Sequence, residues 1–137
     1  MRYLVDANIL SEATKPKPSR RVVDWIVNHD EELVVNPIVL GELEYGILLL
    51  PAGRRRARLL DWFACGAQRL NVVDLDAATA RVWAQLLADL KRKGRAMPIK
   101  DSLIAASARQ HQLIVATRNE SHFRDAGVKV VNPFLAS

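Results

Sequence analysis

Short apolar runs alternate in this chain with longer segments in which apolar residues recur every three or four positions. The runs have the length of single strands, and they are 3–5, 33–35, 71–75, 113–116 and 128–131. Strands joined by helical crossovers form a parallel sheet that is covered by helices on both faces. The alternation therefore predicts a three-layer α/β/α sandwich with a central parallel β-sheet. At 137 residues, one domain over residues 1–137 is expected.

Capping residues and prolines mark where several intervening helices begin. The expected first positions are Ser19, Asn36 with Pro37, Asp76 and Pro98. Ser, Asn and Asp side chains accept hydrogen bonds from the free N–H groups of a first helical turn, and proline fits there because it has no N–H to pair. Gly94 is expected to end the helix that Asp76 starts. Two helices fit between the second and third runs, the later one over about 52–67, and they predict an αα-hairpin.

The composition limits the class of protein. Half of the residues are hydrophobic and 26% are charged, as in globular domains and unlike disordered chains. Cys65 is the only cysteine, so no internal disulfide is possible, and we expect a small packed residue rather than a catalytic thiol. Residues 1–5 look like a strand instead of a secretory signal, and no apolar stretch could span a bilayer. We therefore expect a cytoplasmic protein without a membrane contact.

Three acidic residues stand where the carboxyl edge of the predicted sheet would bring them together. Asp6 follows the first apolar run, Glu42 lies on the helix after the second, and Asp101 begins a late helix. Ligands of open α/β sheets bind at this edge, and clustered carboxylates stay ionised mainly when a cation neutralises them. Taken singly, each acid also has an ordinary explanation, as a helix cap, an ion-pair partner or a first-turn acid. Together they predict a Mg²⁺- or Mn²⁺-dependent enzyme that acts on phosphodiesters.

Uncharged polar residues are expected beside these acids. Asn8 is placed to fix the Asp6 side chain or to reach a bound water, and Thr117 to donate a hydrogen bond to a neighbouring carboxylate. Asn119 offers an amide oxygen as a weaker metal ligand. No histidine stands out as a general base. His122 is near Asn119 in sequence, but a solvated surface side chain is expected there.

The net charge of +5 and the pI near 9.8 suit a protein that attracts a polyanion, although a positive surface also serves solubility alone. The basic residues that lead to Asp101 are expected to contact phosphates: Lys91, Arg92, Lys93, Arg95 and Lys100. The arginines of 54–58 are further candidates for guiding the polyanion, with a solvated face as the alternative.

Five segments, in order along nearly the whole chain, resemble the PIN-domain ribonucleases, especially the VapC and FitB-like toxins of prokaryotic toxin–antitoxin pairs. They are Leu4–Ser11, Gly41–Gly46, Asp101–Ala106, Val115–Asn119 and Val131–Phe134. The resemblance implies that Asp6, Glu42 and Asp101 bind divalent metal and that activated water cuts single-stranded or structured RNA. It also implies that the basic residues guide the RNA, that a small antitoxin covers the acidic site, and that a homodimer is the basic unit.

The chain departs from the family pattern in three places. Ala7 stands where many relatives have Thr, Asn119 where some have a fourth Asp, and His122 where relatives with that Asn often carry an Asp. These residues favour one tightly held ion and a second ion that is recruited with substrate. A Rossmann domain would need a glycine-rich first turn, and a phosphatase of the aspartate type would need an acid at Asn8. The main alternative is a non-catalytic PIN-like module that binds RNA or a protein. Three clustered carboxylates argue against it.

Overall fold

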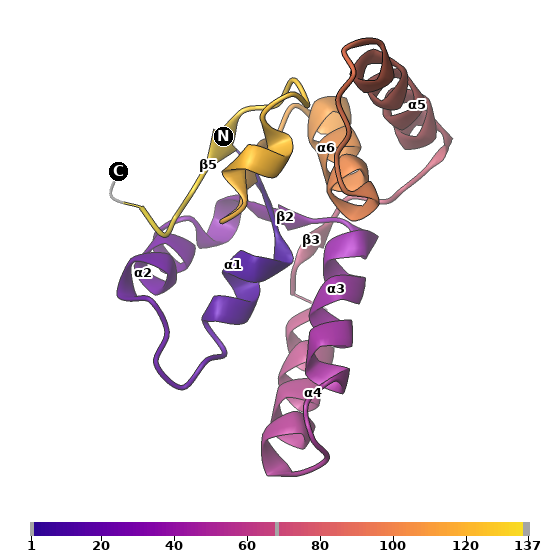
Figure 1. The fold of residues 1–137 in the computed structure, drawn as a ribbon. Helices are drawn as coiled ribbons and strands as arrows, with labels where there is room; N and C mark the ends of the chain where they lie inside the picture. The colour runs from indigo at the N-terminus through magenta and orange to yellow at the C-terminus, as the bar shows by residue number, and fades with distance from the viewer. Residues whose placement is uncertain (1, 68, 136–137) are drawn as a thin grey trace.

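Five parallel strands form one sheet in the computed structural model, which describes residues 2–67 and 69–135 (Figure 1). The strands are β1 (Tyr3–Val5), β2 (Leu33–Val35), β3 (Asn71–Val72), β4 (Ile114–Ala116) and β5 (Val130–Val131). Their order across the sheet is β3-β2-β1-β4-β5, so the first strand of the chain lies in the middle. Every neighbouring pair is parallel, which confirms the expected sheet.

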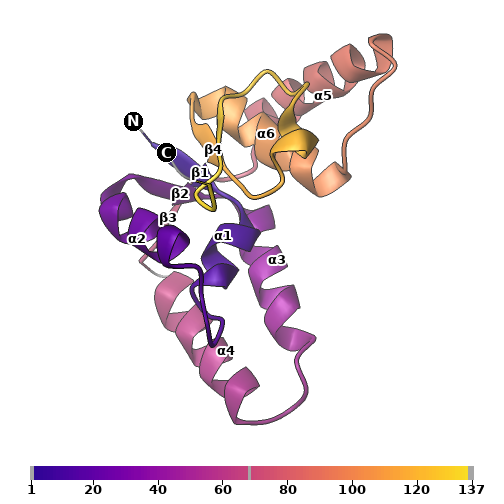
Figure 2. The same ribbon diagram turned by 60° about the vertical axis from the view of Figure 1, so that its left-hand side comes forward.

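Helices cover both faces of the sheet. They are α1 (Ala7–Glu12), α2 (Arg20–Asn28), α3 (Pro37–Leu48), α4 (Arg54–Ala67), α5 (Ala77–Arg92) and α6 (Ile99–His111), with short 3-10 turns η1 (Asp30–Glu32) and η2 (Glu120–Phe123). Both views place α5 and α6 on one side and α1 and α2 on the other (Figures 1 and 2). The expected αα-hairpin is present as α3 and α4, which lie side by side and extend from the sheet.

The three middle strands form the centre of the apolar core. Leu4 is opposite Val34 on one side and Val115 on the other, and all three side chains are completely buried. Strands buried on both faces read as continuous apolar runs, which explains why the sequence shows no alternation there. Within residues 2–67 and 69–135, no helix has the length and apolar content needed to cross a membrane.

Three strands are shorter than the sequence predicts, and the two outer strands differ most. β3 ends at Val72 instead of residue 75, β5 begins at Val130 instead of residue 128, and β4 begins one residue late, at Ile114. β3 and β5 each pair with a single neighbour, so fewer hydrogen bonds hold their ends in the sheet. The helix expected from about residue 52 begins at Arg54.

One local expectation is wrong, and another is confirmed only in the position of the residue. Cys65 is exposed and not packed, because it lies on α4, which extends outward in the hairpin (Figure 1). Ser19 precedes α2, but its side chain makes no capping hydrogen bond; its backbone N–H instead donates to Glu12 Oε2 at 2.8 Å. Asn36 and Asp76 cap α3 and α5 as expected.

Candidate functional site

Backbone hydrogen bonds bring the ends of β1 and β4 together. Val5 lies opposite Ala116, and the next residue, Asp6, donates its backbone N–H to the Ala116 carbonyl at 2.9 Å. The residue after Ala116 is Thr117, whose own N–H is bonded to β5. The sheet register therefore places Asp6 and Thr117 next to each other at the carboxyl edge, although they are far apart in sequence.

Three donors hold the buried carboxylate of Asp6. Thr117 Oγ1 donates to Asp6 Oδ2 at 2.7 Å, and Asn8 Nδ2 donates to the same oxygen at 3.2 Å. The backbone N–H of Ala7 donates to Oδ1 at 2.8 Å, so Asp6 also caps α1. The ordinary explanation of Asp6 as a helix cap is therefore confirmed, and its role as a metal ligand stays a prediction.

Asn8 and Thr117 are themselves fixed by the loop after β4. Asn8 Oδ1 accepts the backbone N–H of Arg118 at 3.1 Å, and Thr117 Oγ1 accepts the backbone N–H of Asn119 at 3.0 Å. Asn119 thus meets this network through its main chain, and its side chain is exposed. Its expected role as a weaker metal ligand stays a prediction.

Glu42 enters the site from the second turn of α3. Its neighbour Leu43 is buried in the core and Glu44 faces solvent, while Glu42 itself is partly buried. Glu42 Oε1 is buried and has no hydrogen-bond partner among residues 2–67 and 69–135, and Oε2 lies 3.9 Å from Lys100 Nζ. An ionised oxygen without a donor is costly to bury, so this position favours a cation.

Asp101 completes the set from the first turn of α6. Its side chain is 11% exposed, and Oδ2 lies 2.8 Å from His122 Nδ1 on η2. His122 is 44% exposed, in keeping with a surface side chain, but the sequence interpretation missed its contact with Asp101. The position of His122, three residues after Asn119, was the sequence signal that could have indicated a role near the site.

The three acids influence one another electrostatically. Burial raises the pKa of the Asp6 carboxyl most strongly; the three hydrogen bonds oppose that rise, and the negative charge of Asp101 adds to it. Burial also raises the pKa of Glu42, with further contributions from Asp6 and Asp101 and an opposing one from Lys100. Carboxylates that affect each other in this way share one local environment.

The donor set fits a hard divalent cation, although the side chains would have to adjust. As they stand, no three His, Cys, Asp or Glu side chains within 2–67 and 69–135 are arranged to hold a metal ion. A positive ion would give the unpaired Glu42 oxygen a partner. It would also lower the raised pKa values of Asp6 and Glu42 by favouring their ionised forms. Carboxylate oxygens are the ligands that Mg²⁺ and Mn²⁺ prefer.

A buried asparagine that the sequence marked only as a cap joins the two helices that carry Glu42 and Asp101. Asn36 Oδ1 accepts the backbone N–H of Val39 at 3.0 Å, and Asn36 Nδ2 donates to Ser107 Oγ on α6 at 3.1 Å. Its side chain is completely buried. Sequence analysis could identify the first bond from the Asn-Pro pair, but not the second.

The expected phosphate-binding residues lie on the surface between α5 and the start of α6. Lys91, Arg92, Lys93, Arg95 and Lys100 are all exposed. Arg92 pairs with Asp89 at 3.2 Å, and Arg95 lies 3.9 Å from Asp125, which is an exposed acid. Lys100 is the member that reaches the acidic site.

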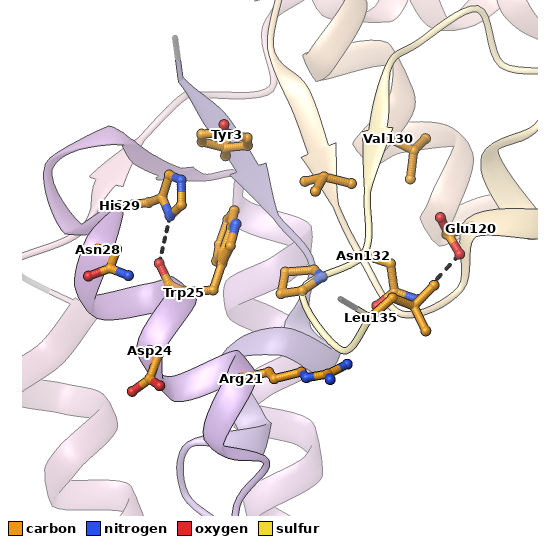
Figure 3. Close-up of a pocket in the computed structure, with 12 residues that line it drawn as sticks. Tyr3, Arg21, Asp24, Trp25, Asn28, His29, Glu120, Val130, Asn132 and Leu135 are labelled. Carbon is orange, nitrogen blue, oxygen red and sulfur yellow. Dashed lines mark hydrogen bonds between the residues drawn. The ribbon is translucent and has the colours of Figure 1, made fainter. Parts of the chain in front are cut away.

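Two cavities lie beside α1 and α2, and one of them is lined by a site acid. A cavity of about 270 Å³ between α1 and the α3–α4 hairpin is lined by Asn8, Glu42 and Trp62, among others. A larger cavity of about 840 Å³ lies between α2 and the segment that follows β5, and its wall includes Tyr3, Trp25 and His29 (Figure 3). None of the three acids lines the larger cavity, so it is separate from the candidate site.

Comparisons with known proteins show the family of the chain. The PIN domain model matches residues 3–129. VapC ribonuclease Y4jK of Sinorhizobium fredii is 35% identical over 135 residues, which are 96% of each chain. Toxin FitB of Neisseria gonorrhoeae is 33% identical over 135 residues, covering 96% of this chain and 97% of FitB.

The solved structures point the same way. The crystal structure of FitAcB from Neisseria gonorrhoeae aligns with a TM-score of 0.91 and 33% identity, over 98% of this chain and 99% of that one. DNA-bound VapBC from Salmonella typhimurium aligns with a TM-score of 0.83 and 26% identity, over 97% and 98%. By sequence and by fold, the chain belongs to the PIN-domain family, as a member of its VapC and FitB-like group.

Proposed function

We propose that this chain is a metal-dependent endoribonuclease and the toxin of a toxin–antitoxin pair. The observation that carries the proposal is the buried Oε1 of Glu42, which has no hydrogen-bond partner among the described residues; nearby Asp6 and Asp101 further raise the pKa of this carboxyl. The names of the relatives, VapC ribonuclease and toxin FitB, support RNA cleavage and a toxin role. A module that only binds RNA has no use for a buried carboxylate cluster, which repels phosphates.

In the proposed reaction, the three acids supply carboxylate oxygens to the metal from different elements of the fold. Asp6 presents a carboxylate whose position is fixed by three donors, while Glu42 and Asp101 supply oxygens from two different helices. A bound Mg²⁺ or Mn²⁺ would supply a water of lowered pKa and neutralise charge on the scissile phosphate. Asn119 is the proposed weaker ligand, for an ion that arrives with substrate.

Lys100 links the acidic site to the basic surface. It lies 3.9 Å from Glu42 and is 63% exposed, so its ammonium group can exchange the carboxylate for an RNA phosphate. The other basic residues of 91–95 extend this surface along the end of α5. We propose that this surface binds the RNA backbone, because lysine and arginine contacts to phosphate provide most of the sequence-independent affinity.

A small antitoxin and a second copy of the chain are the proposed protein partners. The similar solved structures are described as FitAB bound to a DNA fragment and as VapBC bound to DNA. The family resemblance implies that the antitoxin covers the acidic site. The 270 Å³ cavity beside Glu42 is the available concavity there. The proposed location is the cytoplasm, where RNA and antitoxin are present.

The proposal is tested by incubating the purified chain with single-stranded and structured RNA, with Mg²⁺, with Mn²⁺ or with EDTA. We expect cleavage that depends on the metal and that falls roughly a hundred-fold or more in Asp101→Asn. Asp125→Asn is the matched control, since Asp125 is an exposed acid paired with Arg95 outside the site. Equal cleavage by Asp101→Asn and the wild type, or RNA binding without cleavage at any metal concentration, would contradict the proposal.

A further inference from the structure

We propose that His122 is a positioning residue for Asp101: its Nδ1–H holds one carboxylate oxygen and leaves the other for the cation. The inference rests on the proposed metal-dependent function, and it deepens it by adding a residue to the site. The contact that carries it is the 2.8 Å separation between His122 Nδ1 and Asp101 Oδ2.

The direction of this hydrogen bond follows from the chemistry of the two groups. An ionised carboxylate only accepts hydrogen bonds, so the hydrogen must lie on Nδ1. This holds for both the neutral and the charged ring, because Nδ1 carries a hydrogen in the charged ring and in one of the two neutral tautomers. Nε2 is then the nitrogen that takes no part in the contact with Asp101.

Asp101 depends on this bond more than Asp6 depends on any one of its own. Asp6 has three donors, whereas within residues 2–67 and 69–135 His122 is the only group that forms a hydrogen bond or ion pair with the Asp101 carboxylate. Without His122, the carboxylate would be free to rotate about its side-chain torsions. Metal binding would then have to order it, which lowers the affinity.

The backbone around His122 is built to hold the ring in place. Its N–H donates to the Asn119 carbonyl at 3.0 Å, which closes the turn of η2. The next residue, Phe123, is 1% exposed and anchors the turn in the core. The imidazole is therefore presented to Asp101 by a fixed turn that follows directly from the Thr117 network.

A direct metal–nitrogen bond is the competing role for His122, and the contact of Nδ1 with Asp101 leaves only Nε2 for such a bond. Nδ1 is already engaged with Asp101 Oδ2, so it could reach a metal only after that bond is broken. Residues that hydrogen-bond to metal ligands typically change metal affinity by 10–100-fold when they are removed. A positioning role therefore predicts a measurable effect without any bond from the metal to His122.

The experiment is a titration of the purified chain with Mn²⁺. The concentration of free Mn²⁺ is measured from the EPR signal of the aqueous ion. His122→Asn places a side-chain N–H near the position of Nδ1, whereas His122→Leu removes the donor but keeps a similar volume. We expect His122→Leu to weaken Mn²⁺ binding about ten-fold and His122→Asn to stay within about two-fold of the wild type. His111→Leu, at the other end of α6, is the matched control and should bind like the wild type. Circular dichroism melting curves verify that each variant is folded.

His122→Gln replaces the Leu variant if that variant does not fold, because Gln carries its donor near the Nε2 position and so should also bind weakly. Wild-type affinity in His122→Leu or His122→Gln would overturn the inference, and so would an Asn variant as weak as Leu. A nitrogen coupling from imidazole in the pulsed EPR spectrum of bound Mn²⁺ would overturn it in favour of direct ligation. Wild-type protein that binds no Mn²⁺ would overturn the proposed metal-dependent function as well, which distinguishes the two failures.

Discussion

Asp6 and Glu42 are both acids with a raised pKa, but their carboxylates are held in opposite ways. Asp6 accepts hydrogen bonds from Thr117, Asn8 and its own helix, so its geometry is set before any ligand binds. Glu42 has one buried oxygen with no donor and one loose ion pair with Lys100. At the residue scale, the site therefore combines a rigid ligand with one whose charge is poorly compensated.

Glu42→Gln should stabilise the protein in the absence of metal. Burial raises the Glu42 pKa above its usual value of 4.5, so the folded state binds this proton more tightly than the unfolded state. The stabilisation from protonation is fully present below about pH 4.5. It is lost as the pH rises through the higher folded-state pKa. At pH 7 we expect a melting temperature about 2–6 °C above that of the wild type, and a smaller difference as the pH falls toward 4.

Differential scanning fluorimetry in EDTA across this pH range checks the prediction. Glu44→Gln removes a solvent-exposed acid from the same helix and should change the melting temperature little at any pH. Saturating Mn²⁺ should reverse the order, because the wild type gains more from the ion than Glu42→Gln does. A wild type that remains less stable than Glu42→Gln under saturating Mn²⁺ would remove Glu42 from the proposed ligands.

Thr117→Val should weaken metal binding through Asp6. The buried Thr117 hydroxyl donates to Asp6 Oδ2 and accepts the Asn119 N–H, so its loss leaves one acceptor and one donor poorly paired. We expect a loss of about 1–3 kcal/mol in unfolding free energy, a further rise of the Asp6 pKa, and a metal titration that shifts to higher pH. Thr117→Ser keeps the hydroxyl and should restore wild-type behaviour. Equal pH dependence in Thr117→Val and Thr117→Ser would contradict this role.

The elements that carry the site are joined away from the acids. Glu42 lies on α3 and Asp101 on α6, and Asn36 connects these helices by capping one and bonding to Ser107 on the other. On the far side of α6, Trp83 Nε1 on α5 donates to Ser102 Oγ at 2.9 Å, beside Asp101. At the element scale, the distance between the acids is thus maintained by buried polar contacts between helices.

Asn36→Ala should be more destabilising than Ser107→Ala. The first change removes the cap of α3 and the bridge to α6, which together we expect to cost about 2–3 kcal/mol. The second removes only the bridge, at about 1 kcal/mol. Urea unfolding of the two variants and the wild type measures the difference. Equal losses would mean that the cap contributes nothing beyond the bridge.

The whole molecule combines a net charge of +5 with a concentrated acidic site. The basic residues on the surface attract a polyanion over several ångströms, while the three acids repel phosphate unless a cation lies between them. RNA affinity and RNA cleavage should therefore depend on different parts of the molecule. RNA affinity should depend on the basic surface at the end of α5, and RNA cleavage on the carboxyl edge of the sheet.

Replacing Lys91, Arg92 and Lys93 with Gln should flatten the salt dependence of RNA binding. Each lost phosphate contact lowers the slope of log affinity against log salt by roughly 0.7 for single strands. Arg92 already pairs with Asp89, so the two lysines should account for most of the change. Fluorescence anisotropy with a catalytically inactive Asp101→Asn background provides the measurement. A triple Gln replacement of Arg54, Arg55 and Arg58 on α4 is the control, and an equal slope change in both triples would remove the preference for the α5 surface.

The strand–helix alternation and the residue types of the candidate site could be predicted from local patterns in the chain. Continuous apolar runs predicted the parallel sheet correctly because strands buried on both faces have no polar positions. The caps at Asn36 and Asp76 were readable because a cap is a contact within four residues. The acids and their Asn and Thr neighbours could be selected for the same reason, since each stands at a recognisable point next to a strand or a helix start.

The contacts between these side chains could not be predicted in the same way, because they depend on how the elements pack. The Asp6–Thr117 bond follows from the register of β1 with β4, the Asn36–Ser107 bond from the packing of α3 against α6, and the Asp101–His122 contact from the turn of η2. These pairs are 111, 71 and 21 residues apart. Local propensity carries no information about contacts at such separations. Strand register and helix packing are set by the whole core, and the core in turn fixed the site.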